Sequence, residues 1–245
     1  MIPLVFAPGL LCDAAAFAAQ TRALGGQVAD YGAADTIPAM AEAILAQAAE
    51  RFALVGHSMG GRAALEVARQ APERLLGLAL MDTGFAARAP GDAGEMEKAG
   101  RLALVAKART EGMRAMGAQW ARPMVHPSRL DPADPLMDEI LDMIGRKTPE
   151  VFAGQQQALI HRPDATGLLP GIACPTLVLC GVEDAWSPPA QHRALAAAIP
   201  DAVLVEIPDC GHMAPMERPQ AVTAALRSWL DRVGSALTPE QNSAA

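Results

Sequence analysis

The chain has 245 residues, which is enough for one full-sized domain or for one domain with a modest insertion. Hydrophobic residues make up 51% of it and charged residues 19%, so we expect a packed core and not general disorder. The formal net charge of -7 argues against a protein that binds nucleic acid or an anionic membrane surface.

Short apolar runs recur along the chain and predict buried strands. They lack polar/apolar alternation, as expected for a parallel sheet that is covered on both sides. In chain order these runs are residues 2–7, 52–55, 75–81, 176–180 and 202–207, with a weaker candidate at 27–31. Helical periodicity marks residues 36–50, 59–70, 189–199 and 216–232. The alternation predicts the α/β class, with a mostly parallel sheet of about six strands covered by helices on both faces.

Residues 86–165 interrupt this alternation, because they contain no convincing strand and include a proline-rich stretch at 122–135. We interpret them as a helical cap, an insertion of two or three helices joined by a proline-rich loop. The predicted organisation is therefore a core domain formed by residues 1–85 and 166–245, with the cap inserted at 86–165. The final residues, LTPEQNSAA, are expected to be a frayed tail.

The sequence Gly56-His57-Ser58-Met59-Gly60 lies between a predicted strand and a predicted helix. The pattern G-x-S-x-G alone is a weak signal, but this strand–turn–helix context is the one that a nucleophile elbow requires. In such an elbow a sharp turn holds the serine above the sheet, and glycine on either side avoids collisions across the turn. The alternative interpretation is a plain strand-to-helix turn with a serine cap.

A serine hydroxyl is a poor nucleophile near neutral pH and needs a base that is oriented by an acid. Asp184 lies in GVEDAWSPP and His212 lies in PDCGHMAPMERP, each directly after a predicted strand. In a parallel sheet these two loops emerge on the same side as the elbow, so the three side chains are able to converge. Glu183, beside Asp184, and Asp82, at the end of another predicted strand, are the alternative candidates for the acid.

Together, the motifs VGHSMGG, GVEDAWSPP and CGHMAPMERP resemble the α/β-hydrolase superfamily, of the capped esterase, lactonase and C–C hydrolase type. The resemblance covers nearly the whole chain, and it is specific for the fold and the triad but not for a substrate. It implies that Ser58 is the nucleophile, Asp184 the acid and His212 the base. It also implies that residues 86–165 form the lid that such enzymes insert between core strands.

The resemblance implies an oxyanion hole made of two backbone N–H groups. One is the N–H of Met59, and the other is the N–H of Leu10 in the segment FAPGLLCD, with Leu11 as the alternative donor. The family usually has His-Gly in this loop, whereas this chain has Pro8-Gly9. A backbone N–H at Leu10 survives that difference.

The side chains expected to bind the substrate are apolar, namely Leu11, Trp186 and Met213. No arginine cluster is evident in the sequence, and the cap arginines Arg88, Arg122 and Arg162 are expected to be solvated. We therefore predict a serine hydrolase that cleaves a small to medium, mainly apolar and neutral carboxylic ester, thioester or lactone through an acyl-enzyme. The alternatives are a C–C bond hydrolase or perhydrolase on the same triad, or a hydrolase-fold ligand receptor with slow turnover.

No metal or cofactor is expected, because neither a set of metal ligands nor a nucleotide-binding loop is evident. His57 is expected to point away from Ser58, and three further histidines are interpreted as structural or solvated: His126, His161 and His192. The first residues lack the basic region of a signal peptide, and no apolar run has the length of a membrane span. We predict a cytoplasmic monomer or homodimer whose partner is a small-molecule substrate, with no nucleic acid or membrane partner.

Overall fold

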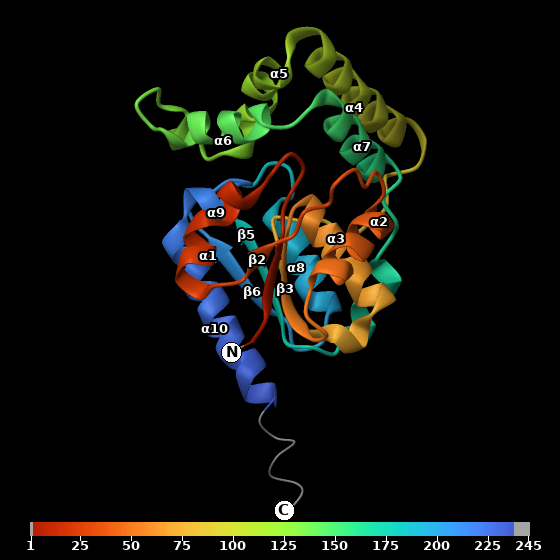
Figure 1. Cartoon of the computed structure of the whole chain (residues 1–245), viewed down its shortest axis with the longest axis vertical. Helices are drawn as coiled ribbons and strands as arrows, with labels where there is room; N and C mark the ends of the chain where they lie inside the picture. Colours follow the sequence, from red (N-terminus) through yellow and green to blue (C-terminus); the bar gives the residue numbers. More distant parts are fainter. Residues whose placement is uncertain (1, 238–245) are drawn as a thin grey trace, which may run out of the picture.

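The computed structural model describes residues 2–237, so the predicted frayed tail lies outside the described residues except for Leu237. Six parallel strands form one sheet in the order β2-β1-β3-β4-β5-β6 (Figure 1). The strands are β1 (Leu4–Ala7), β2 (Gln27–Val28), β3 (Phe52–His57), β4 (Leu75–Met81), β5 (Thr176–Gly181) and β6 (Val203–Ile207). The predicted fold class, an α/β protein with a mostly parallel sheet of about six strands, is confirmed.

The apolar runs form buried strands wherever the strand has a neighbouring strand on each side. All residues of β1, β3 and β5 are buried, in agreement with their lack of polar/apolar alternation. The prediction of a buried strand at 202–207 is wrong for its first part, because β6 is an edge strand and Val203 is 41% exposed. The weak candidate at 27–31 shrinks to the two residues of β2, the strand at the other edge.

Helices cover both faces of the sheet (Figure 1). Three of them, α1, α9 and α10, pack against one another on one side, and α2, α3 and α8 lie on the other. Their bounds are α1 (Ala18–Leu24), α2 (Ile37–Gln47), α3 (Met59–Gln70), α8 (Pro189–Ala198), α9 (Ala214–Glu217) and α10 (Pro219–Leu237). Trp229 of α10 is fully buried, and its indole N–H donates to the carbonyl of Pro175 (2.9 Å), which fixes α10 against the sheet.

The segment between β4 and β5 forms four α-helices, so the expected number of two or three is wrong. They are α4 (Gly91–Glu111), α5 (Met113–Trp120), α6 (Leu136–Gly145) and α7 (Pro149–Ile160). Gly112, at φ 89°, ends α4 and starts α5. The prolines fall at 3-10 turns and helix starts between α5 and α7, at η3 (Arg122–Met124) and η4 (Pro127–Leu130) among others. We keep the term cap for residues 86–165, whose assignment as a separate domain stays a prediction.

The cap lies over the carboxyl ends of the strands (Figure 1). Several hydrogen bonds hold it there; among them, the amide of Leu11 donates to Gln155 of α7 (2.9 Å), and the amide of His212 donates to the carbonyl of Met124 (2.6 Å). Because all strands are parallel, the loops that follow β1, β3, β5 and β6 all emerge beneath the cap. Within residues 2–237, no helix combines the length and apolar character that crossing a membrane requires.

Candidate active site

Ser58 lies in a tight turn between β3 and α3, with the backbone at φ 54° and ψ -116°. This is a strained conformation for a residue other than glycine, and it is the one expected of a nucleophile elbow. The neighbouring backbone approaches so closely that no side chain fits at two of the glycines. A Cβ atom at Gly56 would lie 2.5 Å from the carbonyl oxygen of Gly60, and one at Gly60 would lie 2.0 Å from that of Ala7.

The structure brings the side chains of Ser58, His212 and Asp184 together from three loops. The Ser58 Oγ lies 2.8 Å from His212 Nε2, and His212 Nδ1 lies 2.8 Å from Asp184 Oδ2. His212 and Asp184 are each only 2% exposed, so this chain of two hydrogen bonds is shielded from bulk water. Trp186 packs beside the imidazole of His212, with ring centroids 5.2 Å apart.

The carboxylate of Asp184 has a hydrogen-bond donor at each oxygen. Its Oδ1 accepts from the amides of Trp186 (2.8 Å) and Ser187 (2.9 Å), and its Oδ2 faces His212. Burial alone would raise the pKa of Asp184, but the charge and hydrogen bond of His212 and the two amides hold that pKa below its usual value. Asp184 therefore stays ionised beside the imidazole at neutral pH.

The two alternative acids do not contact the His212 ring. Glu183 is exposed, and its Oε2 accepts from the amide of Cys210 (2.8 Å). Asp82 is fully buried, and its Oδ1 accepts from the amide of Gly181 (3.0 Å). Burial, and then the charge of Asp184, raise the pKa of Asp82 well above its usual value, whereas the pKa of Asp184 is lowered. The geometry therefore pairs His212 with Asp184.

His57 has a supporting contact that the sequence did not reveal. Its Nε2 lies 2.8 Å from the carbonyl oxygen of His212, which accepts only, so Nε2 carries the proton. Burial, and then the charge of His212, lower the pKa of His57 to about 3, which keeps this ring neutral. His57 thus holds the backbone of the loop that carries His212. Of the other histidines, His192 is buried and its Nε2 accepts from the amide of Thr83 (2.9 Å).

The backbone amides predicted for an oxyanion hole differ in whether they already donate a hydrogen bond within the protein. Among residues 2–237, the hydrogen bonds leave the amides of Leu10 and Met59 without a protein acceptor, and both residues border the cavity next to Ser58. The alternative donor, Leu11, is excluded because its amide donates to the Gln155 side chain (2.9 Å). The pair that stays available is therefore Leu10 and Met59.

Gln155 is a buried residue of α7 that holds the loop after β1 in place through this bond to Leu11. We expect Gln155→Leu to lower kcat for an ester substrate by about threefold to tenfold, since a lost buried hydrogen bond is worth about 1 kcal/mol. Gln157→Leu, an exposed change on the same helix, is the control and should keep the kcat of the wild type. Equal kcat values for both variants would show that the bond does not position the loop.

A cavity of about 530 Å³ opens at Ser58, between the strand ends and the cap. Trp186 lines it, as expected, together with Leu10 and Met59. The expectation that Leu11 and Met213 also line it is wrong, because both side chains are fully buried in the core. The backbone turns each of them inward: Leu11 adopts φ 62°, and Met213 directly precedes α9, which packs on α10.

The cavity is also lined by charged side chains, which the sequence analysis did not expect. Arg62, Glu97, Arg101 and Arg162 all border it. Arg162 is not a solvated cap charge, because its side chain is only 10% exposed and both of its terminal nitrogens bind the carboxylate of Glu97. The sequence carried one signal of this charged lining: Arg62 follows Ser58 by four residues and therefore faces the same side of the helix.

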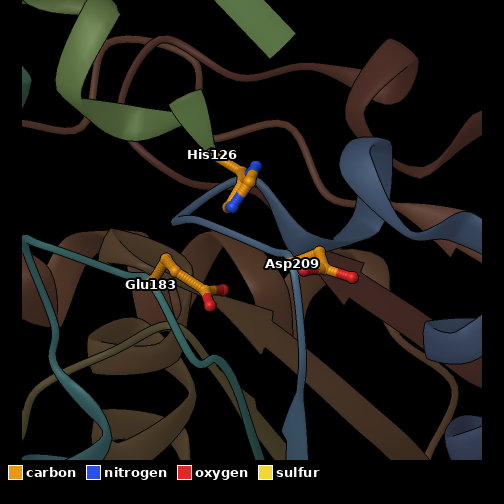
Figure 2. Close-up of side chains that lie close together, drawn as sticks. All are labelled: His126, Glu183 and Asp209. Carbon is orange, nitrogen blue, oxygen red and sulfur yellow. The ribbon is translucent and has the colours of Figure 1, made fainter. Parts of the chain in front are cut away.

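Metal-ligating atoms also come together outside this cavity, at His126, Glu183 and Asp209 (Figure 2). These residues come from three segments, namely the cap and the loops after β5 and β6, and their ligand atoms lie within 4.8 Å of one another. Glu183 and Asp209 are exposed, and Glu183 already accepts from the amide of Cys210. None of the three contributes an atom to the hydrogen-bond chain at Ser58.

We expect activity to persist after treatment with EDTA and dialysis against metal-free buffer, since the hydrogen-bond chain at Ser58 supplies a base without a cation. The measurement is the initial rate with a chromogenic ester before and after this treatment. A loss of activity that a divalent ion restores would overturn the prediction. Glu183→Gln would then show whether the group in Figure 2 is responsible.

Comparisons with known proteins place this chain among hydrolases. A model of the alpha/beta hydrolase family matches residues 5–226. The putative carbamate hydrolase RutD of Klebsiella pneumoniae is 28% identical over 210 residues, which are 82% of this chain and 74% of that protein. A thermophilic esterase from Thermogutta terrifontis superposes with a TM-score of 0.84 and 31% identity, covering 95% of this chain and 90% of the other. The enol-lactonase of Burkholderia xenovorans LB400 superposes with a TM-score of 0.81 and 26% identity, covering 94% of this chain and 92% of the other.

Proposed function

The chain belongs to the alpha/beta hydrolase family and is an enzyme with that fold, and from this premise we propose that it hydrolyses a small to medium carboxylic ester, thioester or lactone. The observation that carries the proposal is the chain of hydrogen bonds from Ser58 through His212 to Asp184. In it, a hydroxyl faces an imidazole nitrogen, and a buried carboxylate faces the other nitrogen.

In the first half of the proposed reaction, Ser58 Oγ attacks the carbonyl carbon of the substrate while His212 Nε2 takes the hydroxyl proton. Asp184 fixes the tautomer of His212 and stabilises the imidazolium that forms. The amides of Leu10 and Met59 donate to the oxyanion of the tetrahedral intermediate. His212 then protonates the leaving alcohol, thiol or ring oxygen, and the acyl group stays on Ser58.

In the second half, a water molecule takes the place of the leaving group. His212 accepts a proton from this water, whose oxygen attacks the acyl carbon and forms a second tetrahedral intermediate. Collapse of the intermediate returns the proton to Ser58 and releases the carboxylic acid. The whole sequence consumes one water and leaves the enzyme unchanged.

A panel of p-nitrophenyl esters, acyl thioesters and lactones, assayed with wild type and Ser58→Ala, tests the proposal. We expect sustained turnover of at least one class by the wild type and none by the variant. A single burst of product equal to the enzyme concentration, with no turnover after it, would favour the slow hydrolase-fold receptor instead. Absence of both a burst and turnover would contradict ester hydrolysis and would favour C–C bond hydrolysis or peroxide-dependent chemistry on the same triad. The cytoplasmic location and the monomeric or homodimeric state stay predictions.

A further inference from the structure

Three guanidinium groups and one carboxylate line the same cavity as Ser58. Arg62 comes from α3, Glu97 and Arg101 come from α4 in the cap, and Arg162 directly follows α7. We call these four residues the arginine wall. It carries an excess of two positive charges, whereas the chain as a whole has a formal net charge of -7. The positive charge is therefore a local property of the cavity.

The single carboxylate of the wall is shared by two of the arginines. Glu97 binds Arg101 Nε (2.8 Å) and both terminal nitrogens of Arg162 (2.6 and 2.9 Å). Among residues 2–237, no carboxylate lies within 4 Å of the Arg62 guanidinium, and the only hydrogen bond of this guanidinium runs from Nη1 to the carbonyl of Ala86 (2.8 Å). The buried Nε of Arg162 also lacks an acceptor. The wall therefore has more donors than the protein has acceptors for them.

Arg62 carries an electrostatic cost that an anion would relieve. Burial, and then the charges of Arg162 and Arg101, lower the pKa of Arg62 to about 9, against weaker opposing effects of Glu97 and Asp164. Arg62 nevertheless stays protonated at neutral pH. Glu97 stays ionised, because the hydrogen bonds of Arg162 and Arg101 outweigh its burial and lower its pKa to about 2. The fixed charges of the wall thus favour binding of a negative group.

The wall is within reach of a molecule that is bound at Ser58. Arg62 follows Ser58 by one helical turn, and its amide donates to the carbonyl of Ser58 (3.4 Å). Gly84 makes room for the guanidinium, since a Cβ atom there would lie 2.5 Å from Arg62 Nη2. The same cavity is also lined by apolar side chains of the cap, which are suited to an apolar segment: Leu104, Trp120 and Leu159.

We propose that the substrate carries an ionised carboxylate in addition to the ester, thioester or lactone that is cleaved, and that Arg62 binds this carboxylate with help from Arg101 and Arg162. The proposal rests on the proposed function, because it places the scissile carbonyl at Ser58. A planar guanidinium with several free N–H groups matches the two oxygens of a carboxylate. The substrate is thus a derivative of a dicarboxylic acid. One carboxyl group forms the ester, thioester or lactone that is cleaved, the other is a free carboxylate, and an apolar segment lies between them.

Monomethyl and dimethyl esters of succinic, glutaric and adipic acid test this inference, because each pair differs only in one negative charge. We expect the wild type to cleave at least one monomethyl ester with a kcat/KM roughly tenfold to a hundredfold above that of its dimethyl partner. Arg62→Gln should remove this preference by lowering kcat/KM for the monomethyl ester at least roughly tenfold. Arg122→Gln removes the same charge from an exposed site of the cap and should keep the preference.

Glu97→Gln should change the preference for the monomethyl ester in the direction opposite to that of Arg62→Gln. It removes the one negative charge of the wall and frees Arg101 and Arg162, so the preference for the monomethyl ester should increase. If Arg62→Gln fails to fold, as judged by circular dichroism and its Tm, Arg162→Gln replaces it and should reduce the same preference. A decrease in preference caused by Glu97→Gln would contradict the inference.

Binding without turnover separates this inference from the proposed function. Glutarate should bind to Ser58→Ala, which keeps the wall but has no nucleophile, and should bind at least roughly tenfold more weakly to the double variant with Arg62→Gln. Equal cleavage of both ester types, with no effect of Arg62→Gln, would overturn the inference and leave ester hydrolysis intact. If no ester is cleaved but glutarate binds through Arg62, the proposed reaction is wrong and the carboxylate site stands. If glutarate binds equally with and without Arg62, the site is wrong.

Discussion

Ser58→Ala is expected to lower kcat by about a million-fold, because in a serine protease with this kind of triad the loss of the serine costs about that much. The substitution removes the oxygen that lies 2.8 Å from His212 Nε2 and leaves the base without a proton to take. The measurement is turnover of a p-nitrophenyl ester, together with covalent labelling by a fluorophosphonate probe. Both signals should disappear.

The control for this prediction is Ser228→Ala, an exposed change on α10, which should keep full turnover and labelling. Alanine at position 58 removes a single oxygen atom and keeps the backbone of the elbow, so the Tm should stay close to that of the wild type. Labelling that persists in a folded Ser58→Ala protein would show that another residue is the nucleophile. In that case the assignment of the elbow is wrong.

Asp184→Asn is expected to lower kcat by roughly four orders of magnitude, as the equivalent change does in a serine protease. The amide of asparagine can present its NH₂ to His212 Nδ1, which then accepts a hydrogen bond and leaves the proton on Nε2, where it cannot receive one from Ser58. The two backbone amides that donate to Oδ1 of Asp184 can donate to the side-chain oxygen of asparagine in the same way. The position of the side chain is therefore kept while its charge is lost. The measurement is kcat for the best ester of the panel at constant pH.

Asp82→Asn is the matched comparison, and we expect it to lower kcat by less than about tenfold. Asp82 does not contact the His212 ring, burial and the charge of Asp184 raise its pKa, and asparagine is close in shape to a protonated aspartate. The same shift predicts a stability effect. A carboxyl whose folded-state pKa is raised binds a proton that the unfolded chain has lost, so the wild type loses stability as the pH rises above the ordinary aspartate pKa.

Asp82→Asn lacks this titration, so its Tm relative to that of the wild type should rise as the pH increases from 4 towards 8. The melting temperatures of both proteins across this range measure the effect. If Asp82→Asn is the inactive variant and Asp184→Asn keeps most of its activity, the acid lies after β4 and not after β5. The proposed triad would then be wrong in that member.

The order of motifs along the chain was sufficient to predict the fold class and the loops that meet at the site. Apolar runs without alternation are strands buried on both faces, and consecutive strands joined by helices must be parallel. Parallel strands direct their carboxyl ends to one edge, so the loops of Ser58, Asp184 and His212 had to emerge together. This conclusion needs only local patterns and their sequence, which is why it did not depend on detailed packing.

Packing decided which of the candidate side chains reach the cavity. Leu11 and Met213 neighbour site residues in the sequence, yet their backbone conformations turn both side chains into the core. His57 supports the His212 loop through a contact between residues 155 positions apart, which no local pattern encodes. A side chain beside a catalytic motif can point either into the core or toward the substrate. Only the complete set of long-range contacts decides between these two orientations.

The sequence by itself determined the family, the α/β fold and the residues proposed as nucleophile, acid and base, because each lies in a short motif at the end of a strand. Tertiary structure decided the arginine wall, of which the sequence showed only the position of Arg62 four residues after Ser58. Arg62, Arg101 and Arg162 are far apart in the sequence, and each resembles a solvated surface charge there. They meet only because the cap folds over the strand ends, where burial and their mutual repulsion turn separate charges into one anion-binding surface.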